Sequence, residues 1–156
     1  QSTQILSSIE SSYRHTPFYE QVYPDLEKLF SANDIYLCDL NVRGILWCLK
    51  VLDIQTTTLL SSQLKVPSNQ NPTMRLVNLC IQTGMSSYIS GPGGKNYMDL
   101  SLFQDNGIDL LWHDSDNINF DYTQMSATFL PNLSILDMFF NLGYKESAEL
   151  FNSKLN

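Results

Sequence analysis

Short apolar runs alternate with helical patterns between residues 55 and 114, and this alternation constrains the fold more than any other feature. The runs TTTLLSS (56–62), SSYIS (86–90) and IDLLWHD (108–114) have the composition of short strands. Helical patterns over 72–83 and 100–106 lie between them, and each is followed by a glycine. Such alternation is typical of a parallel sheet with right-handed crossovers. The sequence therefore predicts a small three-layer α/β domain with flanking helices and a short parallel sheet of about three strands.

The α/β core (55–114) is flanked by helical segments on both sides. Apolar residues recur at helical spacing in the start, 4–52, and in the tail, 131–155. The polar stretch 114–128 predicts a long surface loop, and long loops within domains are usually functional or mobile. A chain of 156 residues suits one domain. Because Gln1 opens in the middle of a helical pattern, we expect this domain to be roughly the C-terminal two-thirds of a longer chain.

Charge and composition exclude several kinds of partner. The formal net charge of −7 argues against nucleic acid and anionic membranes, which would repel the chain. No apolar run is long enough to cross a bilayer, and no signal peptide is visible. The cysteines Cys38, Cys48 and Cys80 have apolar neighbours, as buried thiols of a reducing compartment do. We therefore expect a cytoplasmic protein with neither membrane insertion nor, given two histidines and no cysteine cluster, a metal site.

A glycine-rich loop follows the second predicted strand and ends in a lysine. Ligands of open parallel sheets bind outside the carboxyl ends of the strands, where Ser90, Gly91, Pro92, Gly93, Gly94 and Lys95 are expected. Glycines expose backbone N–H groups and Lys95 adds a positive charge, which suits a phosphate. The loop matches neither the Walker A motif nor G-x-G-x-x-G. A tight turn without a ligand is the alternative, and the residues leave both interpretations open.

The other two predicted strands deliver polar residues to the same edge. Ser61, Ser62 and Gln63 follow the first strand, and His113, Asp114 and Asp116 follow the third. His113 is a candidate base, although a histidine at a strand end often serves only a backbone partner. The aspartates are candidate acid–base groups, although aspartates in polar loops usually stay solvated.

Two aspartates interrupt apolar helical stretches, where an unpaired buried carboxylate would be costly. We expect Asp39 to face water or to pair with Arg43, four residues further on. Asp137, in SILDMFF, raises the same question. Capping does not explain it, because the pattern places it inside a helix.

Four segments, in this order, resemble the WbqC-like protein family: RHTPFYEQVYPDLEKLF, YISGPGGKNYMD, GIDLLWHD and LPNLSILDMFFNLG. The resemblance runs from about Ser7 to Gly143. The loop pattern of the family maps onto Tyr88, Ser90, Gly91, Pro92, Gly94, Lys95, Tyr97 and Asp99, and its later helix motif onto Pro131, Asn132, Leu133, Ser134 and Asp137. The front segment of the family, with His-Gln-Pro and Tyr-Leu-Pro-Trp signatures, is not in this sequence. If that segment supplies a histidine to the site, this chain holds only half of it.

The resemblance implies a role in the biosynthesis of bacterial surface polysaccharide, such as the O-antigen of lipopolysaccharide. The paired signatures are similar to those of nucleotidyl-transfer and adenylating enzymes, which implies a Rossmann- or HUP-like sheet and a nucleotidyl- or acyltransferase. A nucleotide such as ATP, a nucleotide-sugar or an activated acyl donor would bind at residues 90–95 and Tyr97. Asp99, His113 and Asp114 would be catalytic. The alternative is a non-catalytic accessory subunit that binds a pathway enzyme or a second copy through the tail helix DMFFNLG.

Overall fold

The structure is a computed structural model, and it describes residues 2–32, 36–67, 71–113, 120–126 and 128–154. The chain divides into two units, which are described separately below. The helical unit comprises residues 1–56 and 120–156, and the α/β unit comprises residues 57–119. The predicted single domain within a longer chain stays a prediction.

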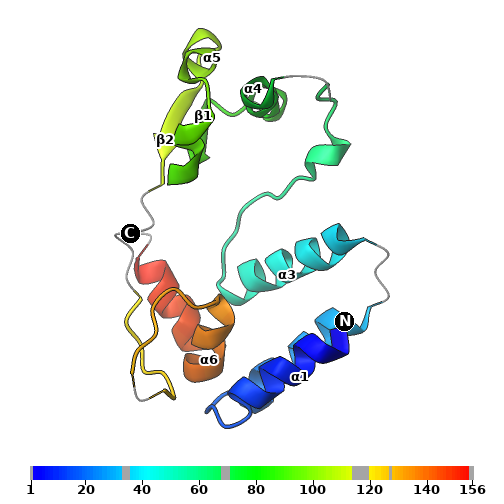
Figure 1. Cartoon of the computed structure of the whole chain (residues 1–156), viewed down its shortest axis with the longest axis vertical. Helices are drawn as coiled ribbons and strands as arrows, with labels where there is room; N and C mark the ends of the chain where they lie inside the picture. Colours follow the sequence, from blue (N-terminus) through cyan, green and yellow to red (C-terminus); the bar gives the residue numbers. More distant parts are fainter. Residues whose placement is uncertain (1, 33–35, 68–70, 114–119, 127, 155–156) are drawn as a thin grey trace. The chain divides into compact units, whose positions relative to one another are not determined.

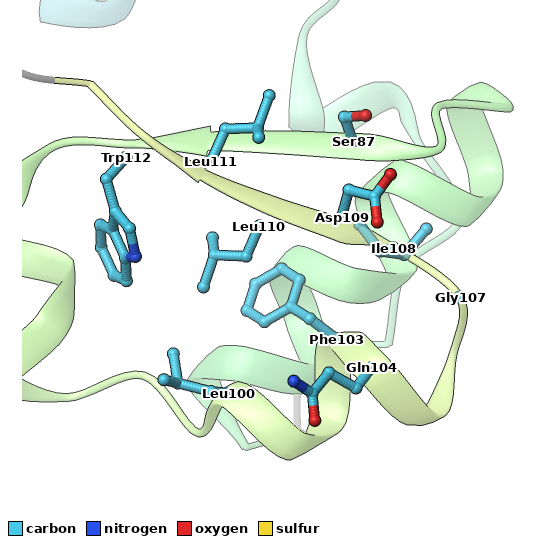
Figure 2. Close-up of a pocket in the computed structure, with 10 residues that line it drawn as sticks. All are labelled: Ser87, Leu100, Phe103, Gln104, Gly107, Ile108, Asp109, Leu110, Leu111 and Trp112. Atoms are coloured by element: carbon cyan, nitrogen blue, oxygen red, sulfur yellow. The ribbon is translucent and has the colours of Figure 1, made fainter.

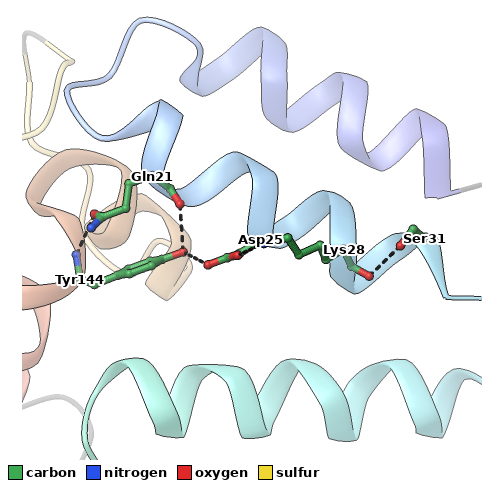
Figure 3. A network of polar contacts seen from close by, with 5 residues as sticks. All are labelled: Gln21, Asp25, Lys28, Ser31 and Tyr144. Atoms are coloured by element: carbon green, nitrogen blue, oxygen red, sulfur yellow. Dashed lines mark hydrogen bonds and ion pairs between the residues drawn. The ribbon is translucent and has the colours of Figure 1, made fainter.

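Among its described residues the helical unit contains four helices: α1 (Ser2–Tyr13), α2 (Tyr19–Ser31), α3 (Leu37–Val51) and α6 (Ile135–Ser153). Helix α2 packs against the other three, and Figure 3 shows it between α1 and α3. Val22 and Leu26 of α2 and Phe139 and Phe140 of α6 are almost completely buried, because an apolar stripe on each helix faces the shared core.

Helix α6 begins at Ile135, later than the predicted position 131, with Ser134 as its N-cap. The Ser134 hydroxyl accepts a hydrogen bond from the backbone N–H of Leu136 at 3.3 Å. Because Met138 is 4% exposed and the two phenylalanines after it are 0% exposed, the predicted contact surface DMFFNLG is wrong: these residues form the core. Gly143 interrupts the helix with φ 75° and ψ 174°.

A polar network joins α2 to α6 at one edge of this core (Figure 3). The Asp25 carboxylate accepts hydrogen bonds from Lys28 Nζ at 3.0 Å and from the Tyr144 hydroxyl at 2.9 Å. Burial opposes ionisation of Asp25, but these two hydrogen bonds outweigh it and hold the pKa below its ordinary value. Burial and Asp25 together raise the pKa of Tyr144.

Replacing Asp25 with asparagine will make the free energy of unfolding depend less on pH in the acidic range. A lowered pKa stabilises the fold above the unfolded-state pKa, and this contribution disappears as the pH falls through the folded-state pKa. We expect Asp25→Asn to lower the free energy of unfolding by about 1 kcal/mol at pH 7 and to match the wild type near pH 2. Urea titrations between these pH values measure the difference. A difference that stays constant with pH would contradict the lowered pKa of Asp25. Tyr144→Phe removes one of the two hydrogen bonds to Asp25, so its pH-dependent loss of stability should be smaller than that of Asp25→Asn.

The α/β unit holds two parallel strands, β1 (Ser87–Ser90) and β2 (Asp109–Trp112), which lie side by side in Figure 1. Helices α4 (Pro72–Thr83) and α5 (Leu100–Asp105) and the 3-10 turns η1 (Ser61–Gln63) and η2 (Pro92–Asn96) complete it. Tyr88, Leu110 and Trp112 pack on a core that includes Val77 and Phe103. On the other sheet face Ile89 is 64% exposed and Leu111 is 50% exposed. The predicted helix 72–83 and the second and third predicted strands are therefore present, the strands at shorter length.

The predicted first strand, 56–62, is wrong. Residues 57–60 have no regular structure, and Ser61–Gln63 form the turn η1, so these three residues do not end a strand. Leu59 is 60% exposed. The β-branched composition misled the prediction because strand propensity depends on packing against neighbours, which this run lacks. Over the described residues the sheet therefore has two strands in place of the expected three.

The cysteines of both units carry free thiols, but the burial predicted from their apolar neighbours is wrong for Cys38. Cys80 is buried and Cys48 is half-buried, whereas Cys38 is exposed. Burial raises the pKa of the Cys48 and Cys80 thiols, which makes them poor nucleophiles at neutral pH. Among the helices that the structure describes, none is long and apolar enough to cross a membrane.

Candidate functional site

The glycine loop begins where β1 ends, next to the end of β2. Ser90 and Trp112 are register partners, and the His113 backbone N–H donates to the Ser90 carbonyl at 2.8 Å. Pro92 opens the turn η2, and the Gly94 N–H donates to the Gly91 carbonyl at 3.0 Å. The structure thus brings the loop and His113 to one edge of the sheet, which is where parallel-sheet proteins bind ligands.

Lys95 is held over the aromatic ring of Trp112. Its Nζ atom lies 5.2 Å from the ring centroid, within the range of a cation–π contact. The lysine side chain is exposed, so its charge is held in place and stays available to an anion from solvent. Trp112 was not predicted as a site residue, because only the parallel register of the two strands places it beside the loop.

The three loop glycines differ in what the fold demands of them. A Cβ atom at Gly94 would collide with the Ser90 hydroxyl and would lie 3.1 Å from the Trp112 ring, so packing requires glycine there. A Cβ atom at Gly91 or Gly93 would meet nothing within 4 Å, and neither residue has a left-handed φ. Neither packing nor backbone conformation in this unit therefore explains these two glycines, which leave the backbone open to an approaching group.

Asp99 makes hydrogen bonds within the fold through both its carboxylate and its backbone N–H. Its carboxylate caps α5, accepting from the Ser101 N–H at 3.1 Å and from the Ser101 hydroxyl at 2.7 Å. Its own N–H donates to the hydroxyl of buried Thr73 at 3.1 Å, which ties α5 to α4. These contacts account for Asp99 without a ligand, and its catalytic role stays a prediction. Tyr97, between the loop and this cap, is 64% exposed.

The remaining predicted site residues follow β2. The His113 side chain is exposed, and its backbone extends the pairing with β1. Asp114 and Asp116 lie outside the described residues. Within the ranges that the structure describes, no three His, Cys, Asp or Glu side chains gather closely enough to hold a metal ion.

A cavity of about 690 Å³ lies along β2 and α5 (Figure 2). Its lining consists of Ser87, Leu100, Phe103, Gln104, Gly107, Ile108, Asp109, Leu110, Leu111 and Trp112. Figure 2 shows Leu110 and Trp112 directed toward Leu100 and Phe103, and Leu111 directed to the other side of the strand. The volume suits a small molecule. Because Trp112 also contacts Lys95, the cavity and the charged loop share one side chain.

A second polar cluster surrounds Asp137 in the helical unit. Asp137 is 5% exposed, and its Oδ2 atom accepts from the Tyr122 hydroxyl at 2.7 Å and from Gln124 Nε2 at 2.9 Å. Burial, and after it the Asp137 carboxylate, raise the pKa of Tyr13 to about 12. Asp137 lies inside α6, as predicted, and Ser134 is the cap; its place in the first turn is one where the helix dipole favours a negative charge.

The same cluster anchors the irregular residues 120–126 and 128–130. Asn141 accepts from the Met125 N–H at 2.9 Å and donates to the Asp137 carbonyl at 2.7 Å. Gln124 Nε2 also donates to the Leu130 carbonyl at 2.9 Å, and Gln124 Oε1 accepts from the Leu130 N–H at 2.7 Å. The sequence signal for Tyr122 and Gln124 was weak, because they lie in a polar stretch without periodicity. The arrangement gives Asp137 a role in organising the backbone.

The described residues define a mixed helix-and-strand protein with a glycine–lysine loop at the carboxyl ends of two parallel strands. The chain belongs to the WbqC-like protein family, whose sequence model matches residues 1–149, and this confirms the predicted family. It is also similar to Uncharacterized protein Rv1507c of Mycobacterium tuberculosis, with 42% identity over 71 residues. These residues are 46% of this chain and only 30% of the length of that relative. No solved structure matches the chain.

Proposed function

We propose that the loop 90–95 binds the phosphate of an activated donor and that the protein acts as a transferase in bacterial surface-polysaccharide biosynthesis. The donor is a nucleotide, a nucleotide-sugar or an activated acyl compound. The observation that carries the proposal is the position of Lys95, whose ammonium lies 5.2 Å from the Trp112 ring beside two glycines without a structural requirement. A fixed positive charge next to open backbone N–H groups is the environment that a phosphate needs.

The proposal assigns separate tasks to the neighbouring residues. Lys95 and the N–H groups of Gly91 and Gly93 stabilise the negative charge that develops on the leaving phosphate. His113 orients the acceptor hydroxyl or amine and takes its proton, with Asp114 and Asp99 as further polar groups. The cavity beside Trp112 receives the part of the donor that is not phosphate. On this proposal β1 and β2 belong to a sheet of Rossmann or HUP type, at the carboxyl edge of which such donors bind.

Replacing Lys95 with alanine will weaken donor binding. A charge-assisted contact to phosphate contributes about 1.5 to 3 kcal/mol, so the dissociation constant should rise by about ten- to a hundredfold. Thermal shift against ATP, nucleotide-sugars and CoA esters identifies the donor, because a ligand stabilises the fold according to its concentration and dissociation constant. Isothermal titration of the wild type and Lys95→Ala with that donor then measures the change.

Lys65→Ala is the matched control, because Lys65 is an exposed lysine of the same unit outside the loop. It should bind the donor as the wild type does. An equal loss in both variants would show that only net charge matters. A donor that binds equally well without Lys95 would refute the phosphate site.

An accessory subunit without catalysis is the alternative, and two observations favour it. Gly94 is explained by packing against Ser90, and Asp99 is explained as the cap of α5. The same panel separates the alternatives, because an accessory subunit leaves the melting temperature unchanged with every donor.

A further inference from the structure

Helix α3 carries a second apolar face that the core of the helical unit does not use. Its core-facing side includes Trp47, Cys48 and Val51. With about 100° per residue, another apolar stripe lies on a different side of the helix. It consists of Cys38, Val42, Ile45, Leu46 and Leu49, at spacings i, i+4, i+7, i+8 and i+11. A helix of a single soluble unit needs only one such stripe, so the second one requires a partner.

Within the helical unit, taken by itself, the second stripe is accessible. Ile45 is 55% exposed and Leu46 is 46% exposed, and Cys38 is also exposed. None of the residues of α3 is fully buried, although the helix is largely apolar. Exposed aliphatic side chains at coiled-coil spacing are typical of a surface that packs against another helix.

The charges beside the stripe indicate which helix fits. Asp39 and Lys50 are both exposed and are eleven residues apart, so they lie on the same flank of the stripe, near its two ends. Arg43 is directed elsewhere, because its Nη2 donates to the Leu29 carbonyl of α2 at 3.0 Å. In a two-fold antiparallel helix pair, this flank of one helix lies against the same flank of the other helix, running in the opposite direction. Asp39 of each copy therefore meets Lys50 of the other, and two opposite-charge pairs form by symmetry.

We propose that the protein forms a two-fold symmetric homodimer in which α3 packs antiparallel on α3 of a second copy through this stripe. Ile45 lies at the midpoint between the two charges and faces Ile45 of the second copy. A parallel pair would fit less well, because it places Asp39 near Asp39 and Lys50 near Lys50. The helix has 15 residues and is about 22 Å long, which gives a small interface and hence a dissociable dimer.

Sedimentation velocity of the whole chain, from about 1 to about 200 µM, tests the dimer and its charge pairs. We expect a concentration-dependent monomer–dimer equilibrium. Asp39→Lys puts like charges together at both ends and should weaken the dimer by about tenfold. Asp105→Lys is the matched control, because it makes the same change at an exposed residue of α5, and it should leave the equilibrium unchanged.

Mixing two charge variants tests the charge pairs on this flank. Lys50→Asp should weaken its own dimer as Asp39→Lys does. The first variant then carries two acidic residues on this flank and the second carries two lysines, so the mixture should form a heterodimer in native mass spectrometry. The double variant with both substitutions should recover the wild-type equilibrium, because an antiparallel pair again places opposite charges together at both ends. In a parallel pair neither single substitution would weaken the dimer, because like charges already face each other there.

Disulfide formation provides a geometric test. In a Cys38→Ser background, Ile45→Cys should give a covalent dimer on mild oxidation, because the two side chains meet at the two-fold axis. The wild type should not cross-link through Cys38. In the antiparallel pair the two Cys38 residues lie on opposite sides of the two-fold axis, offset along the helices by about thirteen residues, or about 20 Å.

Three results would overturn the proposal. The wild type could stay monomeric at the highest concentration, which would assign the stripe to a different partner. Asp105→Lys could weaken association as much as Asp39→Lys, which would make the effect one of net charge. Cross-linking of the wild type through Cys38 would indicate a parallel arrangement. Because all substituted positions are exposed or half-buried, circular dichroism should confirm that each variant is folded.

Discussion

Gly143→Ala is expected to lower the free energy of unfolding of the helical unit by about 3 to 5 kcal/mol. Two independent costs add at this position. The backbone has φ 75° and ψ 174°, a conformation that only glycine adopts readily. A Cβ atom would also lie 2.6 Å from the Phe18 ring and 3.0 Å from the Gln21 side-chain oxygen. The Gln21 side chain does not move away easily, because its Oε1 atom also accepts the Tyr144 N–H at 3.2 Å.

Gly44→Ala is the matched control for this substitution. Gly44 lies within α3, and a Cβ atom there meets nothing within 4 Å. Alanine in a helix interior is preferred over glycine, so this variant should be more stable by about 0.5 to 1 kcal/mol. The two glycine substitutions therefore have opposite signs.

Urea denaturation followed by fluorescence measures both variants. The chain has two tryptophans, and Trp47 packs edge-on against Phe139 in the helical core at 5.4 Å between ring centroids. In a Trp112→Phe background the signal reports on the helical unit alone. A Gly143→Ala variant that unfolds at the wild-type urea concentration would mean that α6 passes through this residue without the observed break.

The sequence predicted local elements better than it predicted partners. Helix α4 follows from Pro72 at its first turn, the Asn71 cap and Gly84 at its end, which are all local signals. The run 56–62 has strand composition but no neighbouring strand, and a strand depends on partners that local composition does not specify. The tail run MFF is apolar in sequence, but only the fold shows that Phe139 and Phe140 fill the core.

The candidate site shows the same division. The glycines and Lys95 were predicted at the carboxyl end of a strand, because the turn signals and the strand are adjacent in sequence. Trp112 and Thr73 were not predicted, since they reach this region through register and packing across 17 and 26 residues. Asp137 was recognised as unusual, but its partner Tyr122 was not, because an irregular segment has no periodicity that assigns its side chains.

Asp137→Ala is expected to lower the free energy of unfolding by about 2 to 4 kcal/mol. The substitution leaves the Tyr122 hydroxyl and one Gln124 N–H without their acceptor in a region that is partly closed to water. It also removes a negative charge from the first turn of α6, which contributes about 0.3 to 1 kcal/mol. Asp121→Ala, an exposed residue of the same segment, is the control and should stay within about 0.5 kcal/mol of the wild type.

The pKa of Tyr13 gives a second measurement that does not depend on unfolding. Burial and the Asp137 carboxylate raise it to about 12. Because the carboxylate contributes part of this rise, Asp137→Ala should lower the pKa of Tyr13, and Asp121→Ala should not. The NMR signal of the labelled Tyr13 ring, assigned by its absence from a Tyr13→Phe variant, reports the change. An unchanged titration would show that the two side chains do not interact.

A double-mutant cycle decides whether Asp137 serves the backbone or a ligand. If the carboxylate mainly holds residues 120–126 and 128–130, Asp137→Ala and Tyr122→Phe remove the same interaction, and their effects on stability should be smaller together than their sum by about 1 kcal/mol or more. Additive effects would contradict this role. A stable Asp137→Ala variant that has lost donor binding would instead place this motif residue in the functional site, because a group kept for a ligand contributes little to the fold without it.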